Sequence, residues 1–247
     1  MDRPNPHRGF RYYDIVVGGM VAVLLCSNLI GPAKTSIVTL PVFGAVAFGA
    51  GNLFFPISYI FDDVLTEVYG YARARRATWI GFGALLFACL MSQAIIHMPV
   101  DPAEPFNRTL QPALVTVFGA TWRIALASLV GFWAGDFVNA FVLAKMKLWT
   151  GGRWLWTRTI GSTIVGEGVD SLTFYPIAFM GIWESQTIVK VIVFNWTMKV
   201  LVETVLTPVT YAVVGFLKRH EHADTYDVGT NFNPFSLRDE GDVRDYR

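Results

Sequence analysis

The chain has 247 residues, of which 53% are hydrophobic and 16% are charged, whereas a soluble domain contains about 25% charged residues. Its apolar residues gather in runs of about 17 to 25, the length of a helix that crosses a hydrocarbon core of roughly 30 Å. This composition excludes an ordinary soluble domain and predicts an integral membrane protein. The net charge is +1, with the basic residues clustered at the ends of apolar runs, so no nucleic-acid partner is expected.

The first apolar run predicts a spanning helix over residues 14–30. It ends at Gly31-Pro32, a turn signal that a continuing helix would not contain. No A-x-A-like cleavage site follows the run, so we expect the helix to be retained. Cys26 and Cys89 both lie inside apolar runs and predict no disulfide framework.

The second span has two competing registers, because Pro41, the Gly-rich run 44–51 and Pro56 interrupt the apolar stretch 37–61. We prefer a start near Leu53, since about 20 residues at 1.5 Å each then reach the far interface near Arg73. The expected helix covers residues 53–71. Residues 37–50 remain as a short Gly-rich element, re-entrant or broken, of a kind tolerated at membrane depth only against protein or water.

Four more spans are expected at residues 77–98, 122–146, 156–180 and 188–217, the last long enough to tilt. Between the third and fourth spans, DPAEPFNRTLQP predicts a Pro-rich loop. Residues 218–247 are polar and contain no apolar run. The sequence therefore predicts an all-α, polytopic protein with one six-helix transmembrane domain, residues 1–217, followed by a polar cytoplasmic tail, residues 218–247.

Orientation follows from the short loops, because an excess of Lys and Arg marks the cytoplasmic side. Basic residues gather at every second boundary: Arg3, Arg8, Arg11, then Arg73, Arg75, Arg76, then Lys145, Lys147, Arg153, then Lys218 and Arg219. Both termini are therefore predicted to be cytoplasmic, in a multi-pass membrane protein.

Several predicted spans carry ionisable side chains, each of which costs about 2.5 to 3.5 kcal/mol at the centre of a membrane helix. We expect these side chains to face inward, where Lys199 is the base at mid-depth. The expected substrate-binding residues are Asp63, Glu67, Asp136, Asn139, Glu167, Asp170, Asn195 and Lys199. Two further acids stay open: Asp62 can face away from Asp63, and Glu203 can simply pair with Lys199. The competing interpretation is that the carboxylates only join the helices by hydrogen bonds.

Two short segments, GDFVNA at 135–140 and GEGVDS at 166–171, share the pattern Gly, acid, x, Val, Asn or Asp, small residue. They lie on successive spans, which run in opposite directions. The pattern predicts an inverted pair around a central site. The small residues alternatively serve only to let the helices approach closely.

Signals for an enzyme are weak. The four histidines, His7, His97, His220 and His222, lie in the termini or at a helix end, so no histidine metal site is expected in the membrane. No Gly-rich phosphate motif and no serine elbow is found, and we expect no cofactor and no metal. A paired-aspartate intramembrane protease built on Asp63 and Asp136 is a formal alternative.

Four segments carry a resemblance to a known family: FPISYIFDDVLTEVYGYARARR, GDFVNAFVLAKMK, TRTIGSTIVGEGVDSLTFYPIAF and TNFNPFSL. Together the chain resembles the queuosine precursor transporter family, also called the vitamin uptake transporter family, from the first span to the tail. The resemblance implies uptake of 7-cyano-7-deazaguanine and 7-aminomethyl-7-deazaguanine across a bacterial inner membrane. The expected site residues within these segments are Asp63, Glu67, Asp136, Asn139, Glu167 and Asp170.

The chemistry of the acids agrees with such a substrate, because a guanine-type edge offers N1–H and an amine side by side and one carboxylate can accept both. Proton-coupled and facilitated transport both remain open, as does a homodimer. The expected partners are a 7-deazaguanine base and membrane lipid. Two other classes are kept: a substrate-binding subunit that needs a separate ATP-driven module, and an intramembrane enzyme or structural helix bundle.

Overall fold

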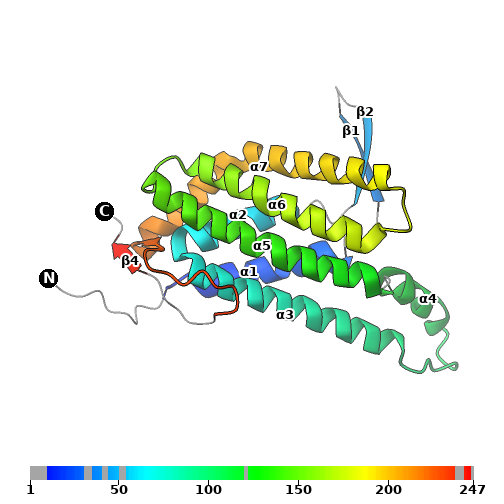
Figure 1. The fold of residues 1–247 in the computed structure, drawn as a ribbon. Coiled ribbons are helices and arrows are strands. Elements are labelled where there is room, and N and C mark those ends of the chain that lie inside the picture. Colours follow the sequence, from blue (N-terminus) through cyan, green and yellow to red (C-terminus); the bar gives the residue numbers. More distant parts are fainter. Residues whose placement is uncertain are drawn as a thin grey trace.

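The computed structural model describes residues 10–30, 35–40, 44–49, 54–119, 122–236 and 242–245 (Figure 1). Within these ranges the protein is a bundle of long helices, which confirms the all-α, polytopic fold class. The helices are α1 Tyr13–Leu25, continued by the π-helix η1 Cys26–Ile30, then α2 Phe55–Tyr69, α3 Tyr71–Ile96, α4 Asn107–Phe118, α5 Trp122–Thr150, α6 Leu155–Phe179 and α7 Ser185–Glu221.

Within the described residues, two short antiparallel strand pairs accompany the bundle. Strand β1 (Thr35–Leu40) pairs with β2 (Gly44–Gly49), and β3 (Ala223–Tyr226) pairs with β4 (Asp242–Asp245). The β1–β2 hairpin projects away from the helices, beside the α6–α7 turn (Figure 1). The described part of the expected Gly-rich element is thus a hairpin that leaves the bundle, instead of a re-entrant segment.

The turn between α2 and α3 differs from the expected register. Helix α2 ends at Tyr69, and α3 begins at Tyr71, joined by Gly70 with φ +86°. A left-handed conformation of this kind favours glycine, and a Cβ at Gly70 would come within 2.5 Å of Thr225 Cγ2. Since α2 has 15 residues, it extends about 22 Å. The expected helix 53–71 is therefore broken at Gly70, and Arg73 lies in the first turn of α3. Its expected start at Leu53 lies outside the described residues.

Helix α4 occupies part of the segment expected to be a Pro-rich loop. It starts at Asn107 and contains Pro112. The residues directly before Asn107 form turns. Every residue of this helix is at least partly exposed. It caps the end of the bundle where α3 ends and α5 begins (Figure 1).

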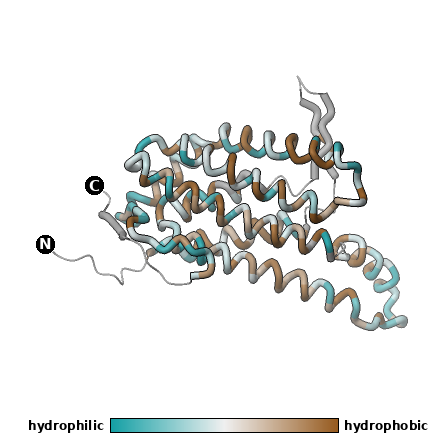
Figure 2. Tube along the Cα trace, viewed as in Figure 1, coloured by the Kyte–Doolittle hydropathy of each residue, from teal (hydrophilic) through white to brown (hydrophobic). Residues whose placement is uncertain are grey.

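Three helices of the described residues are long and apolar enough to cross a membrane: α3, residues 126–150 of α5, and α7. The apolar segment Tyr13–Leu29 is shorter. Apolar residues predominate along the middle of the bundle and polar residues gather at its ends (Figure 2). Large apolar side chains such as Leu90, Leu201 and Val205 are exposed on the outside, as expected for a surface that faces lipid.

The start of α1 and the end of α7 meet at one end of the bundle, which we call the termini end. The carboxylate of Glu221 accepts hydrogen bonds from the backbone N–H groups of Arg11 at 2.9 Å and Tyr12 at 2.7 Å. After His222, which has φ +50°, the chain reverses and residues 223–236 lie across this end. We call residues 223–236 the C-terminal strap. The described part of the expected polar tail is thus packed against the helices.

Candidate functional site

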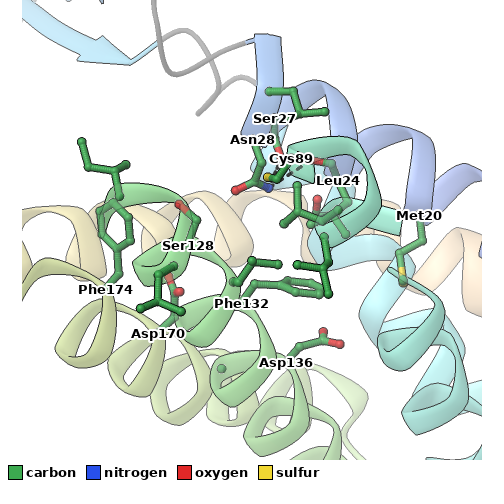
Figure 3. A pocket seen from close by; sticks show the side chains of 18 of the residues that line it. Met20, Leu24, Ser27, Asn28, Cys89, Ser128, Phe132, Asp136, Asp170 and Phe174 are labelled. Carbon is green, nitrogen blue, oxygen red and sulfur yellow. Dashed lines mark hydrogen bonds between the residues drawn. The ribbon is translucent and has the colours of Figure 1, made fainter. Parts of the chain in front are cut away.

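A cavity of about 620 Å³ lies in the middle of the bundle and extends towards the end opposite the termini. Its walls come from α1, η1 and α2 through α7. Figure 3 shows part of the lining, with Ser27 and Asn28 on one side and Phe132, Asp136 and Asp170 on the other. The volume lies within the range of about 300 to 1,000 Å³ that is usual for small-molecule sites.

Lys199 of α7 links two of the expected acids across the cavity wall. Its Nζ donates a hydrogen bond to Asp170 Oδ2 at 2.8 Å and another to Glu167 Oε2. Glu167 and Asp170 are i,i+3 neighbours on α6 and therefore share a face. The side chains of all three remain partly exposed, between 13% and 25%. A ligand in the cavity can therefore reach both carboxylates and the ammonium group.

Asp62 and Asp136 form a second polar group in the cavity. The two carboxyl groups lie close together, and Asp136 Oδ2 accepts a hydrogen bond from Thr78 Oγ1. Asp62, which the sequence left open, thus lies in the cavity next to an expected site residue.

Asp63 turns away from the cavity. Adjacent helical residues are about 100° apart around the axis, and Asp63 points towards α7, where its carboxyl group lies close to that of Glu203. Asp63 is 1% exposed and Glu203 is fully buried. Glu203 therefore does not pair with Lys199, which binds Glu167 and Asp170.

Glu67 is also outside the cavity, in a buried ion network at the termini end. Its Oε1 accepts hydrogen bonds from Lys218 Nζ at 2.6 Å and Arg158 Nη2 at 2.7 Å, and Lys147 Nζ is 3.4 Å away. Lys147 and Lys218 both also bind Asp224 of the strap. These five residues, Glu67, Lys147, Arg158, Lys218 and Asp224, form what we call the ion network.

Asp224 is the acid that the strap contributes to this network. Burial alone would raise the pKa of its carboxyl group, but the ammonium groups of Lys147 and Lys218 outweigh burial and hold that pKa below its ordinary value. Asp224 is consequently ionised at neutral pH and pairs with both lysines at 2.7 and 2.6 Å.

The structure brings six of the eight expected site residues to one cavity. They are Asp136, Asn139, Glu167, Asp170, Asn195 and Lys199. Sequence reasoning did not single out several other lining residues, among them Asn28, Phe132 and Thr163. Asn28 gave a signal, since it is an amide near the end of an apolar helix. Phe132 gave none, because an aromatic residue in a membrane helix is ordinary.

The two GxxxN/D segments face each other where α5 crosses α6. A Cβ at Gly135 would lie 2.8 Å from Asp170 Cβ, and a Cβ at Gly166 would lie 2.7 Å from Asn139 Cβ. Gly135 thus lies against Asp170, four positions after Gly166, and Gly166 lies against Asn139, four positions after Gly135. This reciprocal contact is consistent with an inverted pair, and Asn139 and Asp170 both line the cavity.

Aromatic side chains cover part of the cavity wall. Phe132, Phe174 and Tyr175 line it, and the rings of Phe174 and Tyr175 lie 5.0 Å apart in an edge-to-face arrangement. Trp133, by contrast, packs against Trp79 with ring centroids 6.0 Å apart and is not among the described lining residues. Flat rings of this kind can stack on a planar ligand.

No group of three or more His, Cys, Asp or Glu side chains is placed to hold a metal ion in the part of the chain that the structure describes. The acids in the cavity instead contact Lys199, Thr78 or each other. What this arrangement offers a ligand is a set of hydrogen-bond acceptors, one ammonium group and apolar walls.

Residues 49–213 match the family model described as "Putative vitamin uptake transporter". The chain belongs to this family of transporters. It is also 30% identical over 200 residues to the "Probable queuosine precursor transporter" of Bacillus subtilis (strain 168), an alignment that covers 81% of this chain and 83% of the relative. No solved structure matches the chain.

The family membership decides the broad class. This chain is an integral membrane protein of a transporter family and not an enzyme, which confirms the two coarse predictions made from the sequence. The paired-aspartate protease alternative is set aside, since Asp63 pairs with Glu203 and Asp136 with Asp62.

Proposed function

We propose that this protein imports queuosine precursors, 7-cyano-7-deazaguanine and 7-aminomethyl-7-deazaguanine, across a bacterial inner membrane. The observation that carries the proposal is the acid-rich cavity in a chain of a transporter family. Of the described lining residues, Asp62, Asp136, Glu167 and Asp170 are acidic and only Lys199 is basic. The relative in Bacillus subtilis, named for queuosine precursors, supports the choice of substrate.

The surplus of acids suits a ligand rich in hydrogen-bond donors or carrying positive charge. Unpaired carboxylates inside a membrane protein are costly, and a cationic or donor-rich ligand lowers that cost. The aminomethyl precursor carries a primary amine, which is cationic at neutral pH, and both precursors carry the guanine edge. The cavity would therefore be most stable with such a ligand bound.

Recognition of the guanine edge follows from the same acids. A carboxylate of the cavity accepts N1–H and the 2-amino group together, as two parallel hydrogen bonds. Phe132, Phe174 and Tyr175 supply apolar and aromatic surface for the faces of the bicyclic ring. We assign the binding role to Asp62, Asp136, Asn139, Glu167, Asp170, Asn195 and Lys199, with Asp62 as the α2 acid in place of Asp63 and Glu67.

Both termini are proposed to be cytoplasmic. The basic side chains of Arg73, Lys147, Arg158 and Lys218 all lie at the termini end, and an excess of such residues marks the cytoplasmic side. The cavity extends towards the opposite end, so it faces the periplasm. This orientation fits an importer that takes up its substrate from outside.

Uptake of labelled 7-aminomethyl-7-deazaguanine into liposomes that contain only the purified protein tests the proposal. We expect uptake by the wild type, and loss of uptake in Asp136→Asn and Glu167→Gln, since both amides keep the volume but offer the ligand one acceptor fewer. Asp101→Asn, on an exposed loop, is the matched control. No uptake until an ATPase partner is added would favour the binding-subunit alternative, and normal uptake by both variants would make these acids structural.

A further inference from the structure

The cavity is closed on the termini side by tightly packed side chains. On α5 the described lining residues do not continue past Asn139, and on α6 they do not come closer to the termini end than Thr163. Val68, Leu143 and Ser162, which lie beyond them, are fully buried. A ligand in the cavity therefore has no route to the termini end in this conformation.

The ion network lies directly below this packed layer. On α2, Glu67 follows Asp62 by five residues, which is about 7.5 Å along the helix. Lys147 lies on the same helix as Asp136, and Lys218 lies on the same helix as Lys199. Both lysines are nearer the termini end than the cavity residues. Helices α2, α5 and α7 all line the cavity. Nearer the termini end, the ion pairs of Glu67 with Lys147 and Lys218 hold the same three helices together.

The strap completes the closure by bonding to the ends of α2, α3 and α5. Lys147 Nζ donates to Asp224 Oδ1 and to Thr225 O, both at 2.7 Å. Thr225 Oγ1 donates to Val68 O at 2.9 Å, and the Asp227 carboxylate accepts the Tyr71 N–H at 3.1 Å. These polar contacts can be exchanged for contacts with water when the strap leaves, whereas the Phe232 ring packs against Tyr71 and Phe141.

Arg75 and Trp79 hold the far part of the strap. Arg75 Nη1 donates to Asn231 O at 2.6 Å and to Asn233 O at 2.9 Å, and Trp79 Nε1 donates to Pro234 O at 2.8 Å. Arg75 is 1% exposed. A buried guanidinium that bonds to strap carbonyls would lose those partners on release, so the closed state is a defined arrangement with specific contacts.

We propose that the C-terminal strap and the ion network form a gate on the termini side, and that release of this gate is the step that lets a bound ligand leave towards the termini. The inference rests on the proposed transport function, because a transporter must expose its site to each side in turn. In the conformation described here the gate is shut and the cavity faces the other way.

The test locks the strap to α5 without altering the ion network or the cavity acids. Lys145 Nζ lies 3.8 Å from the centroid of the Phe232 ring, so Lys145→Cys with Phe232→Cys can be joined by a short, reducible bifunctional thiol reagent. Cys26 and Cys89 are first replaced by alanine, and the uptake rate of that background is the reference.

The matched control uses the same reagent within one helix. Lys145 Nζ lies 5.6 Å from the centroid of the Phe141 ring, and both residues belong to α5, so Lys145→Cys with Phe141→Cys joins positions that the gate does not separate. We expect the strap crosslink to lower uptake of labelled 7-aminomethyl-7-deazaguanine at least tenfold while the protein still binds it, and reduction to restore uptake. The control crosslink should leave uptake unchanged.

A second readout needs no substrate. Ser162 is fully buried, and its α6 neighbours Arg158 and Thr163 are also buried. A cysteine introduced by Ser162→Cys should therefore react slowly with a membrane-impermeant maleimide added on the termini side. We expect the strap crosslink to suppress this labelling and Asp224→Asn, which loosens the gate, to increase it several-fold.

The two readouts separate the two claims. The proposed gate would be overturned by full uptake in the crosslinked strap variant. It would also be overturned if Ser162→Cys were labelled equally with and without the crosslink. Absence of uptake even before crosslinking, with labelling that still responds to the crosslink, would overturn the proposed substrate and leave the gate standing.

Discussion

Gly135 of α5 and Gly166 of α6 lie against each other at the crossing of their helices, and a Cβ on either would come within 3.1 Å of the other's carbonyl oxygen. This contact sets how closely the two helices approach, and it fixes the spacing of Asp136, Asn139, Glu167 and Asp170 around the cavity. Small residues allow such approach in membrane helices, where close packing replaces the hydrophobic effect as the driving force.

Gly166→Ala is expected to lower both stability and uptake. The new Cβ would lie 2.7 Å from Asn139 Cβ, so the helices must separate, at a cost of about 1 to 3 kcal/mol. Thermal unfolding in detergent measures the change. Gly168→Ala on the same helix is the control, because its Cβ meets Trp196 Nε1 at an ordinary 3.6 Å. Equal stability of the two variants would show that the crossing is not tightly packed.

Lys199→Met is expected to destabilise the protein and to abolish uptake. It leaves Glu167 and Asp170 without their shared ammonium group, which costs about 1 to 3 kcal/mol for partly buried acceptors. Adding Asp170→Asn should recover part of the lost stability, since one unpaired carboxylate is removed, and a double-mutant cycle measures the coupling. The control, Lys190→Met at an exposed site on the same helix, should change stability and uptake little. Additive effects of Lys199→Met and Asp170→Asn would argue against the observed ion pair.

Asp62→Asn and Glu67→Gln should separate ligand binding from folding. Asp62→Asn is expected to weaken binding of labelled 7-aminomethyl-7-deazaguanine with little loss of stability. Glu67→Gln is expected to cost about 3 to 5 kcal/mol, because three buried cations lose their common partner, while the folded fraction still binds the base. The opposite pattern, with binding lost only in Glu67→Gln, would return Glu67 to the substrate site.

A reporter fused after Arg247 tests the orientation. We expect activity only with a reporter that works in the cytoplasm, because the basic side chains of Arg73, Lys147 and Lys218 lie at the termini end. The matched fusion within the α6–α7 turn, after Gly181, should be active only with a periplasmic reporter. A periplasmic signal at the C-terminus would reverse the proposed direction of the cavity.

The inward position of the acids could be predicted from the sequence, because charge at mid-span is costly wherever it faces lipid. The choice between Asp62 and Asp63 could not. Asp63 and Glu67 do share one face of α2, as their i,i+4 spacing predicts, but that face meets Glu203 and Lys218 of α7. The rotation of α2 about its axis decides this, and the sequence pattern does not specify that rotation.

The docked strap could not be predicted either. Its attachments combine hydrogen bonds from Arg75, Trp79 and Thr225 to backbone carbonyls with ring contacts of Phe232 and Phe235. Such isolated residues leave no apolar periodicity in the sequence. A polar segment of this composition is equally compatible with a free tail. The π-helix at Cys26–Ile30 and the helix α4 were missed for a related reason, since both are short elements at the end of the bundle, set by local packing.

Competition for uptake tests the central claim most directly. Labelled 7-aminomethyl-7-deazaguanine is presented to liposomes with the purified protein, together with adenine, guanine or 7-cyano-7-deazaguanine at equal concentration. We predict inhibition by guanine and the cyano base and none by adenine, whose N1 lone pair would face a carboxylate acceptor, a mismatch that sites of this kind reject by factors on the order of 10⁴. Equal inhibition by adenine and guanine would contradict recognition of the guanine edge by the cavity acids.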